Sequence, residues 1–125
     1  MELLHIDPAV LLSAAAGDGE TCRALSLTFL DITPAMMAKL KAALLADDKA
    51  ATALHAHALK GCTVLVGAAQ LSALLARTES LARRADGPAA GSPADRFPAS
   101  VADIERLYLL VADEVRASIA LFPRA

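Results

Sequence analysis

The chain has few aromatic residues, which limits the kind of core and partner it can have. Phe, Trp and Tyr make up 3% of the sequence and Trp is absent, although 56% of the residues are hydrophobic. The core must therefore consist of Leu, Ala, Val, Ile and Met, as in a helix bundle, and Ala is the strongest helix former. The 12 basic and 14 acidic residues give a net charge of −2. Because no basic stripe with interleaved aromatic residues appears, we expect no nucleic-acid partner.

Long apolar runs and cysteine motifs are also absent. The longest uncharged run, residues 61–76, is too short for a transmembrane span and contains Gln70 and Ser72. The first residues lack the basic start and the long apolar stretch of a signal peptide. Cys22 and Cys62 have no metal-binding or redox spacing, and both are expected to be reduced and buried. We therefore expect a cytoplasmic protein with no membrane segment, no metal site and no cofactor.

Hydrophobic residues recur at helical spacing along most of the chain and predict a single all-α domain over residues 1–125. Two N-terminal helices are predicted over residues 8–16 and 20–32. Four longer helices are predicted over residues 34–46, 48–66, 68–85 and 98–122, with Thr33 and Pro34 as the clearest helix start. Residues 86–97, rich in Gly, Pro, Ala and Ser, are expected to form a flexible loop. Short connections favour antiparallel neighbours, so we expect an antiparallel up-down-up-down four-helix bundle with two additional N-terminal helices.

The helix predicted over residues 48–66 carries histidines on two faces. At about 100° per residue, an apolar arc predicts the buried face; it consists of Leu54, Ala58, Gly61, Cys62 and Leu65. His55 lies beside this arc and is expected in apolar surroundings. The opposite half is predicted to be exposed, and it carries Ala53, Ala56, His57, Lys60, Thr63 and Val64. A metal pair of His55 and His57 is not expected, because side chains two residues apart on a helix diverge and nothing completes the ligand set.

Two polar or flexible positions near His57 allow two interpretations each. Gly61 lies inside a helix, where Gly costs on the order of 1 kcal/mol relative to Ala. It either leaves space for another backbone beside His57 or packs against a neighbouring helix. Gln70 either reaches the neighbourhood of the histidine from the next helix or faces water.

The run Ala56-His57-Ala58-Leu59-Lys60-Gly61, followed by Gly67-Ala68, resembles the core motif of histidine-containing phosphotransfer (HPt) domains of two-component phosphorelays. That motif has Ala, the phosphoacceptor His, any residue, Leu, Lys and Gly, then five or six residues and a second Gly followed by a small residue. The resemblance covers about residues 20–84, including Phe29, Met37, Leu40, Leu44, Leu71, Leu75 and Glu79. Cys62 departs from it, since the family more often has Ser or Ala there.

The resemblance implies a helical bundle that carries a phosphoryl group and has no kinase domain. His57 would be the phosphoacceptor, Lys60 would stabilise the phosphoryl charge, and Gly61 would give clearance for the partner. The implied partners are response-regulator receiver domains and a hybrid sensor histidine kinase. The partner would supply the metal ion, and the family is mostly monomeric. Imidazole suits this role, because its nitrogen is nucleophilic when the ring is neutral.

We also expect partner contacts around His57. Small or apolar side chains on its side of the helix would form a smooth patch suited to transient docking. The expected contact residues are Ala53, Ala56, Val64, Gly67 and Gln70.

Two other functions stay open at this point. A histidine kinase dimerisation domain also presents an exposed His on a helix bundle. That class has an acidic residue directly after its His, where this chain has Ala58, and it needs an ATP-binding domain. No Gly-rich nucleotide motif is present in this sequence. The second alternative is a helical adaptor that carries no phosphate.

Overall fold

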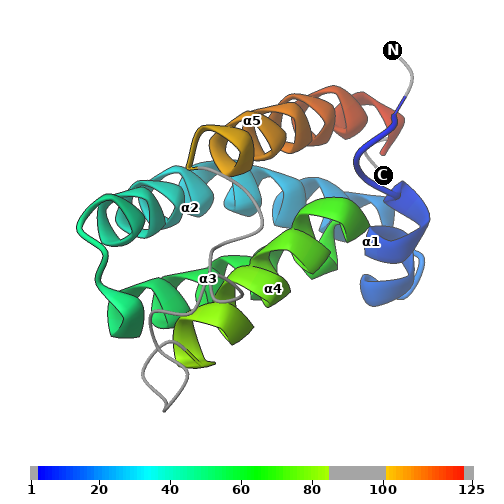
Figure 1. The fold of residues 1–125 in the computed structure, drawn as a ribbon. Coiled ribbons are helices and arrows are strands. Elements are labelled where there is room, and N and C mark those ends of the chain that lie inside the picture. Colours follow the sequence, from blue (N-terminus) through cyan, green and yellow to red (C-terminus); the bar gives the residue numbers. More distant parts are fainter. Residues whose placement is uncertain (1–2, 85–100, 123–125) are drawn as a thin grey trace.

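The computed structural model describes residues 3–84 and 101–122, and the regular structure of these residues is entirely helical (Figure 1). The elements are α1 (Pro8–Ala14), α2 (Gly19–Leu45), α3 (Lys49–Leu65), α4 (Ala69–Arg84), α5 (Val101–Ser118) and the 3₁₀-helix η2 (Ile119–Leu121). No strand occurs in the described ranges, so the all-α prediction is confirmed there. Residues 86–97, predicted as a loop, lie outside them. None of the described helices is long and apolar enough to cross a membrane.

Two pairs of the longer helices, α3 with α4 and α2 with α5, pack as neighbours that run in opposite directions. The hydroxyl oxygen of Thr63, near the end of α3, lies 2.8 Å from that of Ser72, near the start of α4. Similarly, the hydroxyl groups of Thr33 on α2 and Tyr108 on α5 are 2.9 Å apart, and Lys41 further along α2 binds Glu105 earlier in α5. The shared core is fully buried and includes Leu40, Leu59, Leu71, Leu75, Ile104 and Val111. The fold is thus a helical bundle, while the complete up-down-up-down order remains a prediction.

The predicted helix break at Pro34 is wrong, because α2 continues through it for a total of 27 residues. Proline inside a helix lacks the N–H donor and crowds the preceding turn, at a cost of about 3 kcal/mol. Here Pro34 is exposed, whereas Phe29 and Thr33 before it and Met37 after it are buried. Burial of one face on both sides of Pro34 offsets this cost. Consequently one separate helix, α1, precedes the bundle helices instead of the two predicted.

Gly67 ends α3 and forms the turn into α4. Its φ is +71°, in the left-handed region that favours glycine. The N–H of Gly67 donates to the Val64 carbonyl at 3.1 Å and that of Ala68 to the Thr63 carbonyl at 3.0 Å, which is a Schellman C-cap. A Cβ at position 67 would lie 2.6 Å from the Asp7 carbonyl oxygen. Glycine is therefore required both by the turn and by the N-terminal segment that lies against it.

The segment before α1 also binds α5. The backbone N–H of His5 donates to Glu114 Oε1 at 2.8 Å, and His5 Nδ1 pairs with Glu114 Oε2. Burial raises the pKa of Glu114, but the hydrogen bonds from His5 outweigh it and hold the pKa below its ordinary value. The N-terminal segment thus contacts both the α3–α4 turn and the second half of α5.

α3 buries a different face from the one predicted. Its buried residues are Thr52, Ala53, Ala56, Leu59 and Thr63. Leu54 and Leu65, which were predicted to be buried, are 63% and 38% exposed. The prediction sorted residues by hydrophobicity, whereas close packing of α3 between α2 and α4 favours small side chains. The Thr63 hydroxyl is compatible with burial because it bonds to the Lys60 carbonyl and to Ser72.

Candidate functional site

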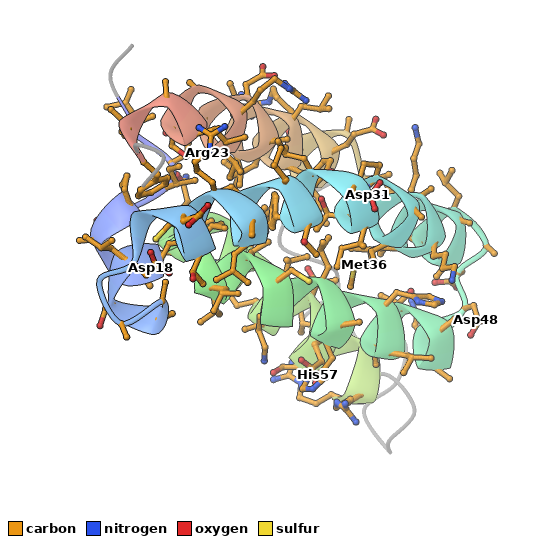
Figure 2. The ribbon with its side chains drawn as sticks, turned by 180° about the vertical axis from the view of Figure 1, so that it is seen from behind. Asp18, Arg23, Asp31, Met36, Asp48 and His57 are labelled. Atoms are coloured by element: carbon orange, nitrogen blue, oxygen red, sulfur yellow. The ribbon has the colours of Figure 1, made fainter. Side chains whose placement is uncertain are left out.

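His57 lies in the middle of α3 with its ring on the surface of the molecule (Figure 2). Its side chain is 62% exposed. The next residue on the surface, Ala58, and Gly61 one turn further along are exposed as well. A large partner can therefore reach the imidazole ring.

The Glu79 carboxylate, on α4, is within hydrogen-bonding distance of the His57 ring. Nδ1 of His57 is 3.2 Å from Oε1 and 3.1 Å from Oε2. An ionised carboxylate only accepts hydrogen bonds, so Nδ1 carries the proton and donates a hydrogen bond to Glu79. In the neutral ring this leaves the free lone pair on Nε2. The contact therefore selects Nε2 as the nucleophilic nitrogen.

Two cations share the carboxylate with His57. Lys60 Nζ donates to Glu79 Oε1 at 3.2 Å from α3. Arg83, one turn further along α4, donates to Oε2 from Nε at 3.1 Å and from Nη2 at 2.8 Å. The Glu79 side chain is only 12% exposed, because these donors surround it. We refer to His57, Lys60, Glu79 and Arg83 as the His57 cluster.

The cluster keeps Glu79 ionised. Burial raises the pKa of Glu79, but the hydrogen bonds from Arg83, His57 and Lys60 outweigh burial and lower the pKa to about 2. The carboxylate thus remains an acceptor at neutral pH and takes no proton from the ring. With a neutral imidazole, the cluster carries one positive charge in excess.

Glu79 is buried, although the charge of a carboxylate would by itself indicate a residue on the outer side of a helix. Glu79 follows Leu75 by four residues and precedes Ala82 by three, so it lies on the buried stripe of α4. A lone carboxylate on such a stripe needs a partner. That pattern is the signal from which its contact with the histidine and lysine of α3 could have been inferred.

The structure decides between the alternatives for Gly61 and Gln70. A Cβ at Gly61 would have no described atom outside its own helical turn within 4 Å, so packing against a neighbouring helix is excluded for the described residues. Gln70 is exposed in the first turns of α4. Along the axis of α4, Gln70 lies about 13 Å from Glu79, the residue that contacts His57. Gln70 thus faces water in the free protein, and its contact with a partner stays a prediction.

Two of the predicted contact residues belong to the core. Ala53 is 7% exposed and Ala56 is 0% exposed, so the helical wheel assigned them to the wrong half of α3. Gly67 is half-buried in the turn, while Val64 is 54% exposed as predicted. The apolar surface beside His57 is formed by another set of residues, which we call the α3 apolar face: Leu54, Ala58, Gly61, Val64 and Leu65.

The remaining sequence candidates lie away from the cluster. His55 is half-buried and lines a hollow of about 310 Å³ with Lys39, Asp48 and alanines of α2 and α3, so its surroundings are mixed rather than apolar. Cys22 is buried, Cys62 is only half-buried, and both are free thiols. Among residues 3–84 and 101–122, no group of three His, Cys, Asp or Glu side chains could hold a metal ion.

Comparison with known proteins gives one family assignment. No curated protein and no solved structure matches the chain. The family model described as the Hpt domain matches residues 24–113, which is well over half of the sequence. The matched range contains α3, α4 and the whole His57 cluster. The chain therefore belongs to the Hpt domain family.

Proposed function

We propose that this protein carries a phosphoryl group on Nε2 of His57, which it accepts from an aspartate of one receiver domain and passes to another. Its family takes part in two-component phosphorelays as phosphoryl carriers rather than as kinases. One observation carries the proposal: an exposed His57 ring donates from Nδ1 to the buried, ionised carboxylate of Glu79. This contact leaves Nε2 as a free, accessible nucleophile.

The transfer step follows from this geometry. The Nε2 lone pair attacks the phosphorus of the partner's aspartyl phosphate. The N–P bond forms while the P–O bond to the aspartate breaks, and the electron pair leaves with the aspartate carboxylate. The ring gains positive charge, which the Glu79 carboxylate at Nδ1 stabilises. The proton stays on Nδ1, where the ionised Glu79 carboxylate accepts its hydrogen bond. The reverse step passes the group to the second receiver.

Lys60 would stabilise the charge of the phosphoryl oxygens. It lies one helical turn from His57, and its side chain is 29% exposed and ends 3.2 Å from Glu79 Oε1. A lysine has a long, flexible stem and a compact charge, so it can leave one acceptor for another nearby. The receiver would supply the metal ion and the aspartate, and this chain would need no cofactor of its own.

The receiver domain would dock on the α3 apolar face. Leu54 and Val64 are 63% and 54% exposed and lie on either side of His57 along the helix. Gly61 leaves open space beside the ring, where a partner backbone can approach. A small apolar surface around one reactive group suits a weak and transient complex. A hybrid sensor histidine kinase as donor, a monomeric state, a cytoplasmic location and an up-down-up-down order of α2–α5 complete the proposal.

Transfer from a labelled receiver domain tests this function. The protein is incubated with a phosphorylated receiver and, in a separate reaction, with labelled ATP. We expect label from the receiver only, and none in His57→Gln. Label taken from ATP would instead favour a kinase dimerisation fragment, and label from neither source would favour an adaptor. His55→Gln is the matched control, since it changes the other histidine of α3 and should still accept label.

A further inference from the structure

The Glu79 carboxylate has more cationic partners than the orientation of one histidine requires. Arg83 Nη2 and His57 Nδ1 both contact its Oε2 atom, at 2.8 and 3.1 Å. Lys60 contacts Oε1 at 3.2 Å. The hydrogen bond to Nδ1 needs only the carboxylate; the two cations offset the burial of Glu79, and their charges also act on the adjacent ring.

An unbalanced carboxylate beside an imidazole favours the protonated ring, because the opposite charge stabilises imidazolium. A protonated ring has no lone pair on Nε2 and cannot attack phosphorus. With Glu79 alone, the contact that selects the reactive tautomer would therefore also reduce the amount of the reactive form. Cations bound to the same carboxylate oppose this effect, since they would lie close to the charged ring.

We propose that Arg83 is a positioning residue that balances the charge of Glu79, so that Glu79 orients His57 without holding the ring protonated. This inference rests on the proposed role of His57 as phosphoacceptor. A guanidinium group suits the task because it stays charged across the whole range in which imidazole titrates. Arg83 also lies one turn from Glu79 on the same helix, so α4 presents both charges together. Lys60 is assigned to the phosphoryl oxygens, and Arg83 is the cation that remains with Glu79 during transfer.

The other charged groups of the neighbouring elements lie farther from the ring. On α2, which packs on another side of α3, Lys39 lines the hollow that contains His55. α1 contains no charged residue. Asp7, its N-cap, lies against Gly67, which is almost three helical turns from His57. The hydrogen bonds around the His57 ring thus involve the charges of Glu79, Lys60 and Arg83, and Lys49 of α3 lines a hollow together with Arg83.

A titration of the ¹⁵N-labelled histidine rings by NMR tests the inference on the full chain without phosphate. Arg83→Gln should raise the titration midpoint of His57 by about 0.5–1 pH unit, while the neutral ring keeps its proton on Nδ1. Arg83→Lys should restore the wild-type midpoint, because it retains the charge. Arg116→Gln is the matched control, since it removes another exposed arginine that binds a carboxylate, Asp113, at 3.0 Å on α5. It should leave the midpoint of His57 unchanged.

The rate of phosphoryl acceptance from a labelled receiver gives an independent result. Below the midpoint, Arg83→Gln should be slower than wild type by about three- to tenfold, which is the loss of neutral ring that such a shift produces. Above the midpoint the two rates should become equal. Since the Arg83 side chain is 61% exposed, the variant should stay folded, which thermal unfolding verifies.

Three results would overturn the role of Arg83. The first is an unchanged midpoint in Arg83→Gln. The second is slowing by the same factor at every pH, which would mean that Arg83 binds the phosphoryl group directly. The third is loss of the Nδ1–H tautomer, which would mean that Arg83 only holds the carboxylate in place. If wild-type protein accepts no label, the proposed function fails, whereas the NMR titration still decides the charge balance.

Discussion

Two histidine–glutamate pairs among the described residues share one local chemistry and differ in their surroundings. In both, a ring Nδ1 contacts a buried carboxylate: His57 contacts Glu79, and His5 contacts Glu114. The His57 side chain is 62% exposed, whereas that of His5 is 22% exposed. Glu114 also accepts the backbone N–H of His5, so that pair fixes the position of the chain as well as of the ring.

The comparison shows that a histidine–carboxylate hydrogen bond does not define a reactive site by itself. Glu79 has two cations that balance its charge, and an apolar face with open space surrounds its histidine. Glu114 instead accepts a hydrogen bond from the backbone of the N-terminal segment. Exposure of Nε2, charge balance and room for a partner separate a candidate phosphoacceptor from a structural contact.

The largest difference is expected when each histidine is replaced. His57→Gln should abolish phosphoryl acceptance and leave stability nearly unchanged, because an exposed side chain buries little surface. His5→Gln should keep acceptance and lower the unfolding temperature, since it leaves the buried Glu114 with one partner fewer. Label transfer and thermal unfolding of both variants provide the measurement. Label on His57→Gln would show that the acceptor is a different residue.

Replacing the two carboxylates should also slow phosphoryl acceptance only at the His57 pair, and by less than replacing the histidine. Glu79→Gln removes the negative charge beside Nδ1 and introduces an amide that can donate as well as accept, so the proton is no longer fixed on Nδ1; we expect acceptance to slow by about tenfold or more. Glu114→Gln should accept phosphate at close to the wild-type rate in its folded fraction. Single-turnover transfer from a labelled receiver measures both. Equal rates for Glu79→Gln and wild type would contradict the role given to the carboxylate.

Changes to the α3 apolar face, which has no counterpart at the His5 pair, should slow transfer by less than the loss of Glu79. Val64→Glu should slow transfer severalfold while the unfolding temperature stays within a few degrees, because it puts a charge on an exposed apolar contact. Gly61→Gln should also slow transfer, yet stabilise α3 by up to about 1 kcal/mol. Rates at several receiver concentrations separate weaker docking from slower chemistry. Normal transfer by Val64→Glu would place the docking surface elsewhere.

The smallest expected effect concerns stability in acid. The pKa of Glu79 is lowered from 4.5 to about 2 in the folded protein, so its contribution to stability is fully present above pH 4.5 and is lost as the pH falls through about 2. In urea unfolding, the difference between the unfolding midpoints of wild type and Glu79→Gln should therefore become smaller as the pH falls from 4.5 to about 2. A gap that is constant from pH 7 to pH 2 would mean that the ionised cluster adds no stability.

Sequence patterns predicted the bounds of α3 and α4 closely, because helix bounds depend on the local order of residues, while the role of His57 stays a prediction. The predicted ranges 48–66 and 68–85 correspond to α3 (Lys49–Leu65) and α4 (Ala69–Arg84). Regular apolar spacing is visible in the sequence, and both ends of α3 depend on local residues, with Asp48 as its N-cap and Gly67 in the left-handed conformation after it. The motif around His57 indicated the family that the Hpt match then established.

Features that depend on tertiary packing could not be found in this way. Pro34 is tolerated because residues on both sides of it are buried by other helices. The buried face of α3 is set by how closely α2 and α4 approach, which favours Ala53 and Ala56 over the larger Leu54. The burial of Glu79 cannot be inferred from its charge, which by itself indicates an exposed residue. In each case the deciding contact comes from another helix.

The positions of the two pairs along the chain also bear on the order in which the protein assembles during synthesis. His57 and Glu79 are 22 residues apart and lie on consecutive helices, whereas His5 and Glu114 are 109 residues apart. At roughly 5–20 residues per second, the ribosome produces the α3–α4 hairpin several seconds before the partner of His5 emerges. Closing the longer loop also costs more entropy. We therefore expect the His57 cluster to form first, within one hairpin, and the contact between His5 and Glu114 to form later.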